Sequence, residues 1–149
     1  MARYFTLDEL TLSATAARLG IDNTPPTAAV ERLETLAERL LDPVRELWGG
    51  PLAVNSGYRC PALNAAVGGA AGSQHMAGEA ADITTGSTEG NRRLFGMISG
   101  NGRSESGYAE NSDHIDNFIE FDQLIDESGY RWLHLSYREG RNRNQILHL

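Results

Sequence analysis

The order of the hydrophobic patterns along the chain constrains its fold most strongly. In the first third, apolar residues from Val30 to Trp48 step mostly by three and four, as on one face of a helix. In the last third, residues 118–125 and 132–137 are short apolar stretches on either side of Ser128-Gly129, which is typical of a β-hairpin. Helices first and strands later predict an α+β fold.

Local signals predict the smaller elements. Thr6 and Ser13 are typical caps of two short helices, the second of which we expect to end at Gly20. Pro43 falls inside the long helical pattern and predicts a kink or break near Asp42. We expect the remaining helices and strands at 52–54, 61–66, 80–84, 88–98 and 145–149. Residues 100–117 are polar and predict a long surface loop.

Length and composition set the class of protein. The 149 residues fit one domain spanning 1–149 with a single core. A hydrophobic fraction of 40% and a charged fraction of 22% are typical of a soluble globular protein. The net charge of -7 and the lack of an obvious basic stripe argue against nucleic-acid binding. The arginines at 138, 141 and 143 are diluted by polar residues and predict a solvated turn.

The sequence shows no export or membrane segment. The N-terminus turns polar by Thr6, before the roughly 7–15 apolar residues of a signal peptide could accumulate. No stretch approaches the ~20 apolar residues of a membrane helix. Cys60 is the single cysteine, which excludes an internal disulfide. We therefore expect a protein made in a cytoplasm, without membrane insertion and with no indication of its oligomeric state.

The segment 73–82 carries the strongest chemical pattern. On a helix, His75 and Asp82 would lie two turns apart, about 10 Å, too far for two ligands each about 2.0–2.2 Å from one zinc. A loop that turns at Gly78 and continues as a strand can bring both side chains together. His134 is expected in mid-strand, where a buried imidazole needs a polar partner. Each residue alone also fits an ordinary core, surface or capping role, but two histidines and one carboxylate form a catalytic zinc set with one position open to water.

Two patterns together resemble a known family. Ser-x-His-x-x-Gly-x-Ala-x-Asp at 73–82, followed by Trp-x-His-x-Ser at 132–136, resembles the zinc D-Ala-D-Ala carboxypeptidases and related phage endolysins of the hedgehog-like fold. Most of the chain is similar to the small stand-alone domains of this group, through the short segments 24–26, 55–59, 121–125 and 142–145. The resemblance implies a hedgehog/DD-peptidase-like fold, with helices packed on a small, mainly antiparallel sheet. It also implies that His75, Asp82 and His134 are ligands of one zinc ion.

The resemblance implies an activity on cell wall. The expected reaction is zinc-dependent hydrolysis of a peptide bond in bacterial peptidoglycan, by a D,D-carboxypeptidase or a stem-peptide endopeptidase. By the same resemblance, Arg59 binds the substrate's carboxylate or polarises its carbonyl, tasks that suit a forked and permanently charged guanidinium. A protein without a signal peptide would reach the wall by release or on a virion, as a phage lysin does. The alternatives are a non-catalytic zinc-containing wall-binding or structural module, and a zinc hydrolase acting on a non-wall peptide.

The chain departs from the family at the general base. Carboxypeptidases of this fold usually have an Asp or Glu three residues before the second histidine, and here that residue is Arg131. This departure favours the binding-module alternative. If a carboxylate elsewhere acts as base, the nearby choices are Asp122, Asp126 and Glu127.

The hairpin register decides between these carboxylates. A turn at Ser128-Gly129 would pair Gln123 with His134 and would put Glu127 on the same face as His134, because side chains alternate along a strand. We therefore predict Glu127 as the base. A change of one residue in the turn would reverse the faces and favour Asp122 or Asp126.

Overall fold

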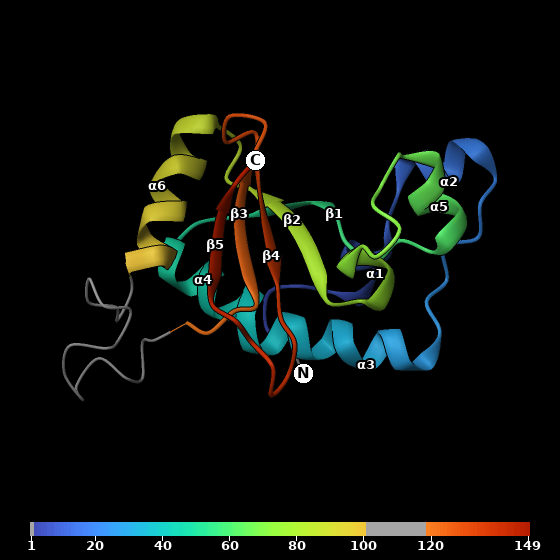
Figure 1. The fold of residues 1–149 in the computed structure, drawn as a ribbon, viewed down its shortest axis with the longest axis horizontal. Helices are drawn as coiled ribbons and strands as arrows, with labels where there is room; N and C mark the ends of the chain where they lie inside the picture. Colours follow the sequence, from blue (N-terminus) through green and yellow to red (C-terminus); the bar gives the residue numbers. More distant parts are fainter. Residues whose placement is uncertain (1, 101–118) are drawn as a thin grey trace.

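The computed structural model describes residues 2–100 and 119–149, which form an α+β fold (Figure 1). The helical elements come mostly before the strands, as the sequence predicted. In chain order the elements are α1 (Leu7–Thr11), α2 (Ala14–Leu19), α3 (Thr27–Leu36), η1 (Ala37–Leu41), α4 (Asp42–Trp48), β1 (Ala53–Ser56), α5 (Pro61–Ala66), η2 (Gln74–Ala77), β2 (Ala80–Thr84), α6 (Thr88–Gly100), β3 (Gln123–Glu127), β4 (Trp132–Ser136) and β5 (Gln145–His148). Apart from Gly100, which ends α6, the loop expected over 100–117 lies outside the described residues.

The first two helices begin at the predicted caps. The Thr6 hydroxyl accepts a hydrogen bond from the Glu9 amide at 3.1 Å, and the Ser13 hydroxyl accepts one from the Ala16 amide at 3.1 Å. Each cap satisfies an amide that has no partner within its own helix. Gly20 ends α2 in the left-handed conformation, with φ 68°. These short helices therefore begin and end where local side chains dictate.

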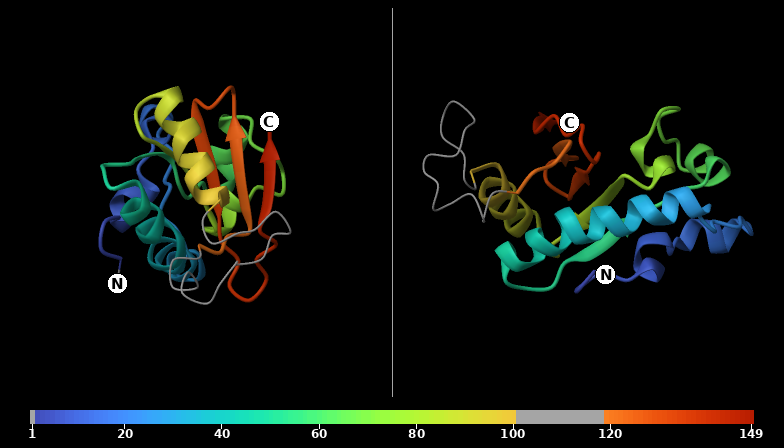
Figure 2. Two further views of the ribbon diagram at one scale, coloured as in Figure 1. Left: turned by 90° about the vertical axis from the view of Figure 1, so that its left-hand side faces the viewer. Right: turned by 90° about the horizontal axis from the view of Figure 1, so that it is seen from below.

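The long helical pattern forms three successive segments. α3 is followed by one π-helical stretch, η1, and then by α4, which has Pro43 in its first turn. Proline lacks an N–H and crowds the carbonyl four residues earlier. Just before Pro43, the backbone hydrogen bonds therefore span five residues, as in a π-helix, instead of four. The helix is not broken near Asp42: helical residues run from Thr27 to Trp48, and the irregularity is a π-helical turn over Ala37–Leu41. The figures show α3 and α4 following one another along a single helical arm (Figure 2).

Over the described ranges 2–100 and 119–149, the sheet has five strands in the order β1-β2-β4-β3-β5. β3 and β5 are parallel, and the other neighbours are antiparallel, which confirms a mainly antiparallel sheet. Alternate residues of β2 and β4, such as Ile83 and Leu133, point into the hydrophobic core with the buried leucines of α3 and α6. The residues between them, Asp82 and His134, belong to the opposite face of the sheet. The core thus fixes the strands from one side and leaves the other side for chemistry.

The hairpin register differs from the expectation by two residues. Gln123 pairs with Ser136, and Ile125 pairs with His134, so the expected pairing of Gln123 with His134 was wrong. The connection spans 128–131 and has Ser128 and Tyr130 at positive φ, in addition to its glycine. Because the error is an even number of residues, the faces are unchanged, and Glu127 belongs to the same face as His134.

In residues 2–100 and 119–149, no helix is both long enough and apolar enough to cross a lipid bilayer.

Candidate metal and catalytic site

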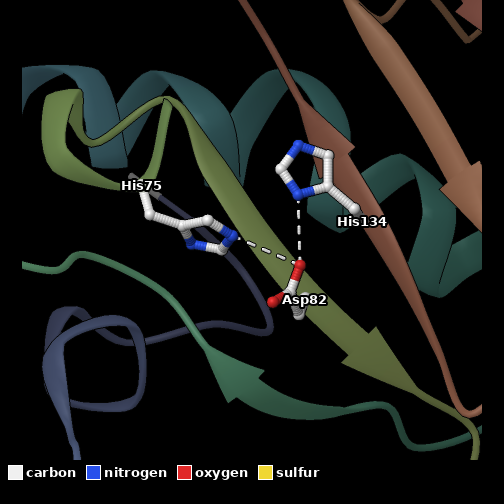
Figure 3. A group of neighbouring side chains, drawn as sticks. All are labelled: His75, Asp82 and His134. Carbon is white, nitrogen blue, oxygen red and sulfur yellow. Dashed lines mark hydrogen bonds and ion pairs between the residues drawn. The ribbon is translucent and has the colours of Figure 1, made fainter. Parts of the chain in front are cut away.

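His75, Asp82 and His134 meet at the open face of the sheet (Figure 3). Asp82 Oδ1 lies 3.3 Å from His75 Nε2 and 3.2 Å from His134 Nδ1. Asp82 and His134 are direct partners across the β2–β4 ladder, whereas His75 comes from η2, just before β2. Ligand atoms of all three residues lie within 4.8 Å of one another. The structure therefore brings together the three residues that the sequence predicted as ligands.

His75 is held by both its backbone and its ring. The Ser73 hydroxyl accepts a hydrogen bond from the His75 amide at 3.2 Å and so caps η2. On the ring, Nδ1 lies 2.7 Å from the Gly57 carbonyl, and only an N–H at Nδ1 can donate to that oxygen. In the neutral imidazole this leaves Nε2 with a lone pair, and Nε2 is the atom that faces Asp82.

Gly78 makes the turn between His75 and Asp82. Its φ is 77°, a left-handed conformation that a side chain would strain. A Cβ at this position would also lie 2.6 Å from the Ala29 carbonyl oxygen of α3. The motif therefore needs glycine for two reasons, and the turn replaces the helix that would have kept the ligands apart.

The donor set fits a zinc ion. Ligand atoms about 2.0–2.2 Å from one tetrahedral zinc are about 3.3–3.6 Å apart, close to the two distances from Asp82 Oδ1. Burial raises the pKa of Asp82, but the neighbouring rings of His134 and His75 outweigh it and hold that pKa below its ordinary value. Asp82 is therefore a carboxylate, and a His75 ring that carries its one proton on Nδ1 turns a lone pair toward it. Two facing acceptors need a cation between them, either a proton or a metal ion.

Arg59 lies beside this cluster with its guanidinium incompletely paired. The Arg59 amide donates to the His75 carbonyl at 3.1 Å, which ties its loop to the ligand. Its Nε is buried and has no hydrogen-bond partner among the described residues. Burial lowers the pKa of Arg59, and the charges of Asp82 and Glu127 partly oppose this. A desolvated guanidinium with an unused donor is suited to an anionic or strongly polar ligand.

Glu127 lies at the edge of the same hollow. A cavity of about 500 Å³ is lined by Arg59, Glu127 and the three candidate ligands, together with most of residues 67–74 and parts of β3 and β4. Glu127 accepts a hydrogen bond from the indole N–H of Trp132, its partner across the hairpin. That bond holds the carboxylate in one orientation. The structure therefore brings Glu127 to the site, and its role as base stays a prediction.

The two other carboxylates have different surroundings. Asp122 is fully buried and binds the Arg143 guanidinium through two bonds of 2.9 Å, and Gln74 at 2.8 Å. Asp126 belongs to the opposite face of β3 and contacts His148. Neither lines the cavity around the candidate ligands.

The basic residues near the hairpin and the C-terminus also have defined places. Arg131 is exposed in the hairpin turn and does not line that cavity. Arg143 was expected in a solvated turn. Its side chain is 50% exposed, yet it neutralises buried Asp122, so it has a structural partner that the sequence did not reveal.

Sequence reasoning missed two supporting residues. The Asn23 side chain accepts a hydrogen bond from the Cys60 amide at 2.8 Å and donates one to the Tyr58 carbonyl at 3.0 Å. It therefore binds the backbone on both sides of Arg59. Gln74 links the segment beside His75 to Asp122. Neither role has a local sequence signal, because each partner lies more than 30 residues away.

Comparison with known proteins agrees with this site. The sequence model of the family described as Peptidase M15 matches residues 3–117, well over half of the 149 residues. The match includes His75 and Asp82 and ends before His134. His134 pairs with Asp82 across the β2–β4 ladder. No curated protein sequence matches the chain. The family supports a metallopeptidase acting on a peptide substrate, and the α+β structure is consistent with its fold. The chain therefore belongs to the Peptidase M15 family.

Proposed function

We propose that this protein is a zinc-dependent peptidase that hydrolyses a peptide bond in bacterial peptidoglycan. One observation carries the proposal: three candidate zinc ligands, a carboxylate and an incompletely paired guanidinium line a single cavity. A purely structural zinc site is usually closed by four protein ligands. Here the described residues supply three, and the cavity opens beside them.

The residues of the cavity divide the chemistry between them. Zinc held by His75, Asp82 and His134 would polarise a peptide carbonyl and make water more acidic. Glu127 would take a proton from water and pass it to the leaving amine. Arg59 would hold the substrate through its carboxylate or through the oxygen that becomes negative during the reaction. Trp132 would keep the Glu127 carboxylate aimed into the cavity through the indole hydrogen bond.

The proposed setting is the cell wall, reached after release from the cell that makes the protein. A phage lysin or a virion component acts in this way, and this part of the proposal rests on the sequence resemblance and on analogy. Arg131, which favoured a non-catalytic module, is exposed away from the cavity, while Glu127 lines it. These positions support the enzyme over the binding module.

The test is release of new amino groups from purified peptidoglycan, followed with and without a chelator. We expect activity to vanish on chelation and to return on adding zinc. Glu127→Gln should lower turnover by roughly 10²–10⁴-fold with zinc still bound, because it keeps the shape and removes the basicity. Glu139→Gln, the same change at an exposed carboxylate outside the cavity, should have no effect.

Two results would contradict the proposal. Full activity in Glu127→Gln would remove that residue from the mechanism. A zinc-loaded wild type that binds wall and releases no amino groups would favour a binding module instead.

A further inference from the structure

Four residues form a row across the strands at the site. Ser56 of β1 pairs with Asp82, Asp82 pairs with His134, and His134 pairs with Ile125 of β3. Residues paired directly across a ladder share a face, so this row crosses the open face from one sheet edge toward the other. The two candidate ligands in the row occupy its middle positions.

A hollow lies at each end of the row. The cavity already described, about 500 Å³, contains Ile125 at one end. A second hollow of about 410 Å³ contains Ser56 at the other end and is bounded by residues 12–15, by 54–59 and by α5. Both hollows are lined by Arg59, Val67 and Asp82. They therefore adjoin, and we treat them as one groove with Arg59 and Asp82 at the boundary between its halves; His75 and His134 line the first half.

The second hollow is chemically neutral beyond the boundary that it shares with the first. Among the described residues that line it, Arg59 and Asp82 are the charged ones. Its rim includes Leu12, which is 79% exposed, and Val67, which is 45% exposed. Such a surface suits the uncharged continuation of a peptide chain. A terminal carboxylate held by Arg59 would leave this hollow empty, whereas a peptide chain that continues past the cleaved bond would occupy it.

We infer that a peptide substrate crosses the whole groove, so that the protein cleaves internal peptide bonds and does not remove a terminal residue. This inference rests on the proposed function and chooses between the carboxypeptidase and the endopeptidase that it leaves open. Arg59, in the middle of the groove, then serves the carbonyl oxygen of the bond being cleaved. Hydrolysis adds one water across that bond and yields one new carboxylate and one new amine.

The first experiment maps the bonds that are cut. Zinc-loaded protein is incubated with peptide-bridged dimers and with single stem peptides from digested wall, and the products are identified by mass spectrometry. We expect each bond that is cut to be internal, with at least two residues of the peptide on either side of it. Release of single C-terminal residues alone would overturn the inference while leaving the proposed function intact. No cleavage of either substrate would contradict both.

A second experiment fills the second hollow. Ala14 is exposed on α2 and lines this hollow, whereas Ala17 is exposed on the same helix and lines a separate depression. Ala14→Trp should lower kcat/KM for internal cleavage by roughly tenfold or more, a typical effect of misfit in a binding pocket. Ala17→Trp should match the wild type. Equal activity of both variants would overturn the inference.

Binding measurements separate occupancy from chemistry. In the Glu127→Gln background, calorimetry with an uncut peptide-bridged dimer should show weaker binding for Ala14→Trp than for Ala17→Trp. Leu12→Ala, at a highly exposed position that the fold tolerates, should raise KM for internal cleavage without changing zinc content. An unchanged affinity in Ala14→Trp together with an unchanged KM in Leu12→Ala would show that substrate does not reach this hollow.

Discussion

Replacing Asp122 by asparagine should destabilise the protein strongly, although this residue lies outside the catalytic cavity. Asp122 is fully buried and accepts four hydrogen bonds, three from Arg143 and one from Gln74. Asparagine has nearly the same shape, but its NH₂ group faces other donors where a carboxylate oxygen accepted before. The change therefore removes the charge, loses hydrogen bonds and sets donors against donors.

The magnitude follows from the burial of the two partners. Removing one partner of a buried ion pair costs about 3–5 kcal/mol, and a half-exposed Arg143 places this pair near the lower end. For a domain of this size, about 3 kcal/mol corresponds to a fall in Tm of roughly 6–12 °C. Arg143→Gln should cost at least as much, because it leaves the fully buried Asp122 carboxylate with Gln74 and a backbone amide but without a charged partner.

The pH dependence gives a sharper test than the size of the effect. Hydrogen bonds from Arg143 lower the pKa of Asp122, although burial opposes them, and the pKa in the unfolded chain is about 3.9. A carboxyl whose folded pKa is lowered stabilises the protein above its unfolded pKa and loses that contribution as pH falls through the folded pKa. The stability difference between wild type and Asp122→Asn should therefore be full at pH 7 and should shrink below about pH 4.

The assay is urea unfolding followed by circular dichroism at several pH values, with chelator present so that metal binding does not change with pH. The remaining titratable groups are the same in both proteins, so their contributions cancel in the difference. A Tm at pH 7 within a degree of the wild type would refute the reasoning. A stability difference that does not change between pH 7 and pH 3 would show that charge is not the cause.

Three further predictions concern the site itself. Elemental analysis should find one zinc per chain, mostly lost in His75→Ala and His134→Ala and retained in the control His148→Ala; full zinc in both ligand variants would exclude the site. Arg59→Ala should lower turnover while barely moving Tm, and Arg59→Lys should rescue it only partly, since an ammonium cannot fork; unchanged turnover would remove its role. Gly78→Ala should lower both stability, by roughly 1–3 kcal/mol or more, and zinc affinity, because a Cβ meets the neighbouring α3 backbone at a positive φ; wild-type values in denaturation and metal titration would contradict this.

Elements set by nearby residues were predictable from sequence. The caps at Thr6 and Ser13, the helix irregularity before Pro43 and the turn at Gly78 each depend on residues within a few positions. The resemblance supplied the candidate ligands, and the structure shows that they meet. These features could be predicted because their causes are local or because their motif is compact.

Features that depend on distant packing could not be predicted. The hairpin register was off by two because Ser128 and Tyr130, neither of them glycine, adopt positive φ and lengthen the turn. Three such features join segments that are far apart in sequence. They are the position of β4 between β2 and β3, the ion pair of Asp122 with Arg143, and the hydrogen bonds of Asn23 to the Arg59 loop. No periodicity or turn motif encodes such a choice of partner.

The separation of the three candidate ligands along the chain bears on how long the protein survives. His75, Asp82 and His134 come from η2, β2 and β4, so an ion bound to all three would close a long stretch of chain and join two neighbouring strands at their centre. A ligand that binds only the folded state adds stability with its concentration, about 4 kcal/mol at a thousand times its Kd. The zinc concentration would then set the population of molecules with an unfolded sheet, and with it the rate of proteolysis. A protein starved of zinc would be degraded faster as well as being inactive.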